Sequence, residues 1–277
     1  MIVIVGLGPG TWGQLSVEAG EALQSAKNLW LRTAVHPTVE ALRERGIAFV
    51  TFDEVYEQAA SFDDVYQHIV DRLLAEKEVT YAVPGHPLIG ERTVELLLAE
   101  AEKRNIPTKV IPSMSFVDVI WPALGISGDG VQLVDALALE CDQLQPNQPY
   151  LLMQVYNRLV ASELKLRLMN CYPDEHEIVV VRGAGIPGWQ RILRVPLYRL
   201  DNLDWLDHLT SVYLPPVAPG THYDLADLVT VMKRLLGPNG CPWDRKQDHH
   251  SLKKYLVEEA EEVLGAIDSG DMDHLCE

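Results

Sequence analysis

The stretch "MIVIVGLGPG", residues 1–10, decides the fold of the first part of the chain. Its run from Ile2 to Val5 is short and fully apolar, which is typical of a strand buried on both faces in a parallel sheet. A loop rich in glycine follows the strand directly, and an amphipathic segment follows from about Leu15 to Ala26. A buried strand, a glycine loop and a helix in this order predict the first unit of a parallel α/β sheet.

Strand-like and helix-like segments continue to alternate as far as about Pro112, which predicts a first α/β domain over residues 1–112. Beyond it, strand-like patterns dominate and predict a second α/β domain with a more mixed sheet over 113–214. The segment "LPPVAPGT" (Leu214–Thr221) holds three prolines and a glycine in eight residues. Because proline fixes φ and removes a donor, we expect a linker over 215–223. Residues 224–277 show only helical periodicity, which predicts an all-α segment.

The composition excludes several classes of protein. The 277 residues carry a net charge of −17, which argues against nucleic-acid binding because that function needs a basic face. The four cysteines are dispersed and form no C-x-x-C pair, as expected of a cytoplasmic protein with reduced thiols. We find no signal-peptide pattern and no apolar stretch of membrane-spanning length, so neither secretion nor a membrane is predicted.

Two loops rich in glycine and proline follow predicted parallel strands. "GLGPG" (Gly6–Gly10) lacks the third glycine of the dinucleotide fingerprint, because Thr11 stands in its place. It is either a tight turn or a loop that lets a ligand approach the backbone. "YAVPGHPLIGERT" (81–93) also runs from a strand through a Gly/Pro loop into a helix. Since both loops lie at the carboxyl ends of strands in one sheet, they are predicted to line one crevice.

A third motif, "GAGIPG" (Gly183–Gly188), matches the spacing G-x-G-x-x-G. A strand-like segment follows it where the fingerprint requires a helix. We therefore expect a loop between two strands and no nucleotide-binding role.

The ordered set "VGLGPG", "YAVPGHP", "IPSMSF", "YLLMQV" and "RGAGIPGWQR" resembles the tetrapyrrole methylase family of S-adenosylmethionine-dependent enzymes. The resemblance covers roughly residues 1–214. It implies two α/β domains with the methyl donor in the cleft between them, usually in a homodimer, and a small-molecule methyl acceptor. It also implies that Gln190 lies in a family motif. The donor-binding residues implied by the resemblance are Gly8, Pro9, Gly10, Gly85, His86, Pro87, Ser115 and Met153.

One residue departs from the family pattern, in which the second loop usually contains Gly-Asp-Pro. Here His86 replaces the acid. The basic groups that a polycarboxylate tetrapyrrole would require are also not obvious, so no tetrapyrrole substrate is assigned. Two alternatives to a methyltransferase follow. The domain is a degenerate methylase-like sensor, or it serves only to dimerise the segment that follows.

The last predicted helix carries Glu258, Glu259, Glu261 and Glu262. On a helical wheel Glu258, Glu259 and Glu262 share one arc beside an apolar stripe, whereas Glu261 points away. Three carboxylates at this spacing can converge on a hard cation such as Mg²⁺. The alternative is that acids on a terminal helix are solvated, and the helix by itself favours this interpretation.

The wider stretch "GCPWDRKQDHHSLKKYLVEEAEEVLGAIDSGD" (240–271) closely resembles the MazG-type nucleoside triphosphate pyrophosphohydrolases. The resemblance implies an all-α, dimerising domain that splits NTPs into NMP and pyrophosphate with Mg²⁺. It also implies that Glu258, Glu259 and Glu262 are metal ligands. The family's second metal motif, E-x-x-D, does not follow within the chain. We therefore expect this MazG-type segment to be incomplete and to lack turnover by itself. Trp243 is expected to anchor a core, and Asp271 to cap the next helix.

Overall fold

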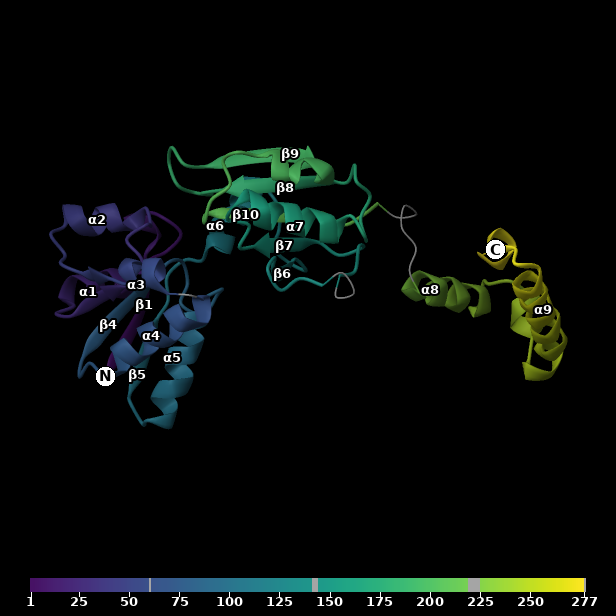
Figure 1. Cartoon of the computed structure of the whole chain (residues 1–277), viewed down its shortest axis with the longest axis horizontal. Coiled ribbons are helices and arrows are strands. Elements are labelled where there is room, and N and C mark those ends of the chain that lie inside the picture. Colours follow the sequence, from purple (N-terminus) through teal and green to yellow (C-terminus); the bar gives the residue numbers. More distant parts are fainter. Residues whose placement is uncertain (60, 141–143, 219–224, 277) are drawn as a thin grey trace. The chain divides into compact units, whose positions relative to one another are not determined.

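The computed structural model describes residues 1–59, 61–140, 144–218 and 225–276. The predicted linker, 215–223, therefore lies mostly outside the described residues. Contacts divide the chain into two compact units, Met1–Ala218 and Pro219–Glu277 (Figure 1). The finer division into residues 1–112, 113–214, 215–223 and 224–277 stays a prediction.

The first sheet of the larger unit has the strand order β3-β2-β4-β1-β5, and all its neighbours are parallel. Its strands are β1 (Ile2–Gly6), β2 (Leu29–Leu31), β3 (Val50–Thr51), β4 (Val79–Val83) and β5 (Thr108–Ile111). The apolar run at the N-terminus thus forms a central strand between β4 and β5, as its sequence predicted. In this register Gly6 pairs with Val83, so the loops after β1 and β4 leave the sheet side by side.

Helices cover both faces of this sheet, since successive side chains of a strand point to opposite faces. Ile2 and Ile4 pack in one buried cluster with α4 and α5, and Val5 packs in another with α1 and α2 (Figure 1). The helices of this half are α1 (Val17–Ser25), α2 (Thr38–Glu44), α3 (Asp53–Gln58), α4 (Phe62–Leu74) and α5 (Arg92–Lys103), with a 3₁₀ turn, η1, at Trp12–Gln14.

The second sheet has the order β6-β7-β10-β8-β9. Only β6 and β7 are parallel; the other neighbours are antiparallel, so this sheet is mixed, as its sequence predicted. Its strands are β6 (Gln132–Asp135), β7 (Tyr150–Met153), β8 (Glu177–Arg182), β9 (Arg191–Pro196) and β10 (Thr210–Leu214).

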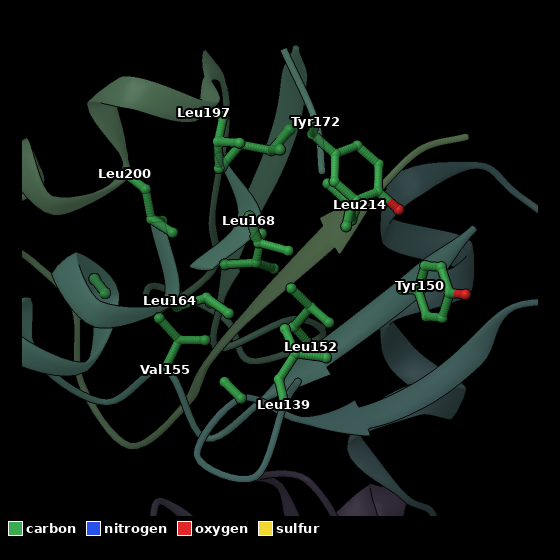
Figure 2. Close-up of a cluster of buried hydrophobic side chains, with 14 of the residues drawn as sticks. Leu139, Tyr150, Leu152, Val155, Leu164, Leu168, Tyr172, Leu197, Leu200 and Leu214 are labelled. Carbon is green, nitrogen blue, oxygen red and sulfur yellow. The ribbon is translucent and has the colours of Figure 1, made fainter. Parts of the chain in front are cut away.

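The largest buried cluster lies on one face of the second sheet (Figure 2). Tyr150 and Leu152 of β7 face Leu164 and Leu168 of α7 (Arg158–Leu168) within it. The opposite face packs against α6 (Phe116–Leu124), which connects the two sheets in sequence. Each sheet therefore has its own core, and α6 starts directly beside the carboxyl end of β5.

Two local expectations were inaccurate. The strand-like segment after Gly188, "RILRVPLYRL" (191–200), suggested a strand as far as Leu200, but β9 ends at Pro196 and a 3₁₀ segment, η3 (Leu197–Asn202), follows it. Leu197 N still donates to His176 O at 2.8 Å, but His176 N donates to Pro173 O at 2.9 Å, so the ladder between β8 and β9 ends there. The helix α3 was not predicted, because its six residues are too few for a clear period. The loop character of Gly183–Gly188 is confirmed, since it joins β8 to β9.

The smaller unit is helical in its described residues. It contains α8 (Leu225–Leu236), η4 (Asp244–Lys246), α9 (His249–Ser269) and α10 (Met272–Cys276). Asp271 accepts a hydrogen bond from His274 N at 3.1 Å, as expected of a helix cap. Ala266 is the only buried residue among those of this unit whose side chains are described. Trp243 is 52% exposed, so the prediction of a core anchor was wrong here, because the unit has almost no core for it to enter.

Nowhere in the described ranges is a helix both long and apolar enough to cross a membrane.

Candidate functional site

The two glycine loops of the first sheet are hydrogen-bonded to each other. Gly8 N donates to Gly85 O at 3.2 Å, and Gly85 N donates to Gly8 O at 2.9 Å. Both residues have a positive φ, +63° and +65°, which side chains rarely tolerate. The loops after β1 and β4 thus form one structure at the carboxyl edge of the sheet, where α/β folds bind ligands.

Gly6 makes this close approach possible. A Cβ at this position would lie 2.5 Å from Gly85 O, 2.9 Å from Pro87 Cδ and 3.0 Å from Ser113 N. Two of these three neighbours are backbone atoms of adjacent strand ends, so they cannot rotate away. The absence of a side chain at Gly6 therefore allows the three loops after β1, β4 and β5 to lie this close together.

The third loop, after β5, is tied to the first by hydroxyl groups. Ser113 Oγ donates to Gly6 O at 2.7 Å, and Ser16 Oγ donates to Pro112 O at 2.6 Å. Ser115 is buried and caps α6: its Oγ accepts from Val117 N at 3.3 Å. Ser115 thus positions the helix that leads into the second sheet.

The loop Gly183–Gly188 of the second sheet meets the first glycine loop. Gln14 Nε2 donates to Gly185 O at 3.0 Å, which connects the two halves of the unit directly. A Cβ on Gly10 would lie 2.4 Å from Ile186 Cδ1, so this glycine leaves room for Ile186. Gln190 Oε1 accepts from Gly185 N at 2.9 Å and holds the loop in shape.

These loops border a cavity of about 470 Å³ between the two sheets, which is open to solvent on part of its surface. That volume lies in the range of sites for one small-molecule ligand. Residues of both halves line it, and among them Gln154 has a φ of +68°, an uncommon conformation for a non-glycine residue. The less polar residues of the lining include Pro9, Gly85, Ile89, Gly90, Phe116, Val119, Ile120, Met153, Gly183, Ala184 and Ile186.

Of the eight residues implied as donor-binding, three line the cavity: Pro9, Gly85 and Met153. Gly8, Gly10, Pro87 and Ser115 shape the surrounding loops and helix through the contacts just described. His86 is outside the lining and makes a turn, since its Nδ1 accepts from Leu88 N at 3.1 Å. An aspartate makes the same kind of bond to the backbone two residues on. His86 therefore fills a role in loop geometry that the acid can also fill.

A group of polar side chains on the cavity, which we call the polar wall, was missed in the sequence. It consists of Arg32, His36, Asp53, Tyr56 and Glu91. These residues come from segments that follow β2, β3 and β4, at the same edge of the sheet as the glycine loops. Their position directly after predicted strands was the available signal. Because their residue types form no motif, position after a strand gave no reason to select these residues as site residues.

Arg32 and Glu91 form a buried ion pair in the polar wall, and Glu91 is only 4% exposed. Arg32 Nε also donates to Tyr56 Oη at 2.8 Å, while Thr93 Oγ1 donates to Glu91 Oε2 at 3.1 Å. Burial opposes the charged guanidinium, but the contact with Glu91 outweighs it and keeps the pKa of Arg32 above its ordinary value. Asp53 accepts from Thr33 Oγ1 at 2.5 Å and from Ala34 N at 2.8 Å, which fixes its carboxylate.

His36 is the neutral member of the polar wall. It is 6% exposed, and its Nδ1 has no hydrogen-bond partner in the described part of the chain. Burial, with a smaller contribution from the neighbouring His208, lowers the pKa of His36 to about 3. His208 also lines the cavity but belongs to the segment before β10 in the second sheet. An unpartnered buried nitrogen costs free energy, so its presence on a cavity is a sign of a ligand contact.

In the smaller unit, Glu258, Glu259 and Glu262 lie on α9 and are exposed. Their carboxylate oxygens are the donor type that Mg²⁺ prefers. Across the described residues, however, no three or more His, Cys, Asp or Glu side chains converge closely enough to hold a metal ion. The three glutamates thus fit one side of a magnesium site by chemistry and spacing, and do not enclose an ion by themselves.

Comparison with known proteins agrees with the geometry of the larger unit. The family model of tetrapyrrole (corrin/porphyrin) methylases matches residues 1–201. The chain belongs to this family. A solved structure of the family, uroporphyrin-III C-methyltransferase from Thermus thermophilus complexed with S-adenyl homocysteine, superposes with a TM-score of 0.55. At 16% identity, over 77% of this chain and 96% of that one, it shows the tetrapyrrole methylase fold.

A second family model, that of the MazG nucleotide pyrophosphohydrolase domain, matches residues 247–277 of the chain. MazG of Thermotoga maritima, a nucleoside triphosphate pyrophosphohydrolase, is 51% identical over 51 residues, which are 18% of this chain and 20% of MazG. The uncharacterized protein YabN of Bacillus subtilis is 42% identical over 282 residues, covering 100% of this chain. The chain spans 58% of the length of YabN. A methylase-like domain followed by a MazG-like segment is thus the organisation of this chain.

Proposed function

We propose that the larger unit binds S-adenosylmethionine in the cavity between its two sheets and transfers the methyl group to an acceptor. The observation that carries this proposal is the joined pair of glycine loops beside Met153, at the edge of the sheet where α/β folds place ligands. The family relative crystallised with S-adenyl homocysteine, the demethylated form of the donor, supports the same cofactor class.

The donor supplies an electrophilic methyl group on a positively charged sulfur. The chain's own residues position and desolvate the reacting groups. Apolar side chains of α6 and Ile186 exclude water from one side of the cavity, and the fixed glycine loops leave backbone groups accessible. Alignment of donor and acceptor in one site provides the main rate enhancement expected for such a transfer.

Calorimetric titration of the 277-residue chain with S-adenosylhomocysteine tests donor binding. We expect saturable binding, and no heat of binding even at millimolar ligand would refute the proposal. A methylated product from S-adenosylmethionine then separates a methyltransferase from a sensor. His86 slightly favoured the sensor interpretation, and it acts in a turn outside the cavity lining. The sensor stays the alternative that this assay tests.

For the smaller unit we propose that Glu258, Glu259 and Glu262 supply one side of a Mg²⁺ site for hydrolysis of NTPs to NMP and pyrophosphate. The MazG match and the spacing of the three acids on α9 support it. When bound, the metal would neutralise the triphosphate and activate water. The carboxylates would hold it from one helix face, with the remaining oxygens coming from water, substrate or other protein groups.

Pyrophosphate release from NTPs in the presence of Mg²⁺ tests this second activity. We expect none from the 277-residue chain, because its acids do not converge, and release from a chimera that adds the rest of YabN. Glu262→Ala should abolish release in the chimera, whereas Glu261→Ala should not, since Glu261 lies on another side of the helix. If the 277-residue chain releases pyrophosphate and Glu262→Ala abolishes this release, the expectation that its metal site is incomplete is wrong. Size-exclusion chromatography with light scattering tests the further proposal of a homodimer.

A further inference from the structure

The polar wall has hydrogen-bonding groups that the protein itself does not satisfy. Nδ1 of His36 has no partner among the described residues, and Arg32 uses Nε and Nη1 but makes no hydrogen bond there through Nη2. Both side chains line the cavity. A neutral imidazole carries one donor and one acceptor, so either tautomer leaves Nδ1 able to form one bond. A ligand with a hydroxyl, amine or amide group can form this hydrogen bond to Nδ1 in either tautomer.

The charge on the cavity lining opposes a polyanion. In the part of the lining that the structure describes, Asp53 and Glu91 are carboxylates and Arg32 is the single guanidinium. The charge of Arg32 is already balanced by Glu91, with which it forms an ion pair. Asp53 therefore remains as an excess negative charge, on a chain whose net charge is −17. Several ligand carboxylates would be repelled here and would find no free cation.

The volume of the cavity also restricts the size of the acceptor. About 470 Å³ is typical of a site for a single small ligand, and the proposed donor must occupy part of it. The glycine loops, Met153 and the polar wall all contribute to the lining of this volume. Space beside the donor is thus sufficient only for a small molecule or for a small group of a larger one.

We propose that the polar wall takes the methyl acceptor, and that the acceptor presents an uncharged hydroxyl, amine or amide group to His36 instead of a polycarboxylate tetrapyrrole. This inference rests on the proposed methyl transfer. A lone pair on the acceptor's oxygen or nitrogen forms the bond to the methyl carbon, and the carbon–sulfur bond breaks with its electron pair on sulfur. The acceptor's proton leaves to solvent. His36 orients the reacting group through its free nitrogen.

The experiment uses the whole 277-residue chain saturated with S-adenosylhomocysteine. Ligand-observed NMR measures binding of ethanolamine, N-methylacetamide and phenol, which offer an amine with a hydroxyl, an amide, and an aromatic hydroxyl. Uroporphyrin III serves as the polycarboxylate tetrapyrrole. The variants are His36→Phe, which removes the hydrogen bond, and His36→Gln, which retains one. His68→Phe makes the same change on the exposed side of α4 as a control.

We expect at least one small probe to bind, and uroporphyrin III to bind more weakly than that probe. Binding of the small probe should weaken by roughly tenfold in His36→Phe, the loss of about one hydrogen bond, and less in His36→Gln. His68→Phe should behave as the unmodified chain. Retained affinity for S-adenosylhomocysteine shows that each variant is folded, and His36→Gln provides the test if His36→Phe does not fold.

Three results would overturn the inference: no small probe binds, uroporphyrin III binds more tightly than the probes, or His36→Phe leaves probe binding unchanged. Failure of S-adenosylhomocysteine to bind the unmodified chain is a different result, which refutes the proposed function. In that case the probe titrations are repeated without S-adenosylhomocysteine, and they still decide whether His36 contacts a small polar ligand.

Discussion

The change Gly6→Ala tests how the glycine loops build the cavity. The added methyl group would lie 2.5 Å from Gly85 O, whereas ordinary contacts between non-bonded heavy atoms are about 3.5 Å or longer. One of the two strand ends therefore has to move by roughly 1 Å. The neighbouring Gly13 offers a matched control, because a Cβ there meets nothing within 4 Å.

The magnitude follows from two contributions. Overpacking of a rigid site costs about 1–3 kcal/mol, and the two hydrogen bonds between Gly8 and Gly85 are worth about 0.5–1.5 kcal/mol each. We expect Gly6→Ala to lower the free energy of unfolding by about 2–6 kcal/mol if movement of the loops breaks these bonds. The site should also lose affinity for S-adenosylhomocysteine, since the loops that shape it separate.

Urea denaturation followed by circular dichroism measures the stability, and calorimetry measures the ligand affinity, for Gly6→Ala and Gly13→Ala side by side. Gly13→Ala should match the unmodified chain in both. If Gly6→Ala were as stable as Gly13→Ala and bound S-adenosylhomocysteine equally well, the close approach of the loops would not be required, and the reasoning would be refuted.

Three further predictions concern stability, each measured by urea denaturation. Glu91→Leu leaves Arg32 buried without its carboxylate and should cost about 3–5 kcal/mol, against at most about 1 kcal/mol for Glu95→Leu, which breaks an exposed pair with Arg92; equal losses would contradict this. His36 has a pKa of about 3 when folded and an ordinary value of 6.5, so the unfolded chain binds one more proton between these pH values. The free energy of unfolding should therefore fall by about 2 kcal/mol from pH 7 to pH 5, and a slope of the same size in His36→Phe would exclude this origin. Ser16→Ala removes both the cap on Ala19 N and the hydrogen bond to Pro112 O, and should cost about 1–2 kcal/mol; a loss no larger than that of Ser25→Ala, on the exposed end of α1, would show that these bonds contribute little.

Local patterns predicted most of the fold because each sheet is built from short segments with their own period. The apolar run Ile2–Val5 became a central parallel strand, and the mixed character of the second sheet followed from its strand-rich sequence. Ends of elements were less accurate where hydrogen bonds to a neighbouring segment decide them, as at the end of β9. The loop Gly183–Gly188 was placed correctly between two strands, yet its contact with Gly10 was not expected.

The sequence by itself determined the parallel α/β start, the two glycine loops at one sheet edge and the acidic face of α9, because spacing and periodicity along the chain carry that information. Only the tertiary structure decided which residues meet in the cavity. Arg32, His36 and Glu91 are separated along the chain and form no motif, and they come together because β2 and β4 are neighbours in the sheet. His86 lies in a turn outside the cavity lining, and the sequence could not show this for the same reason: the direction of a loop side chain is fixed only by packing against other loops.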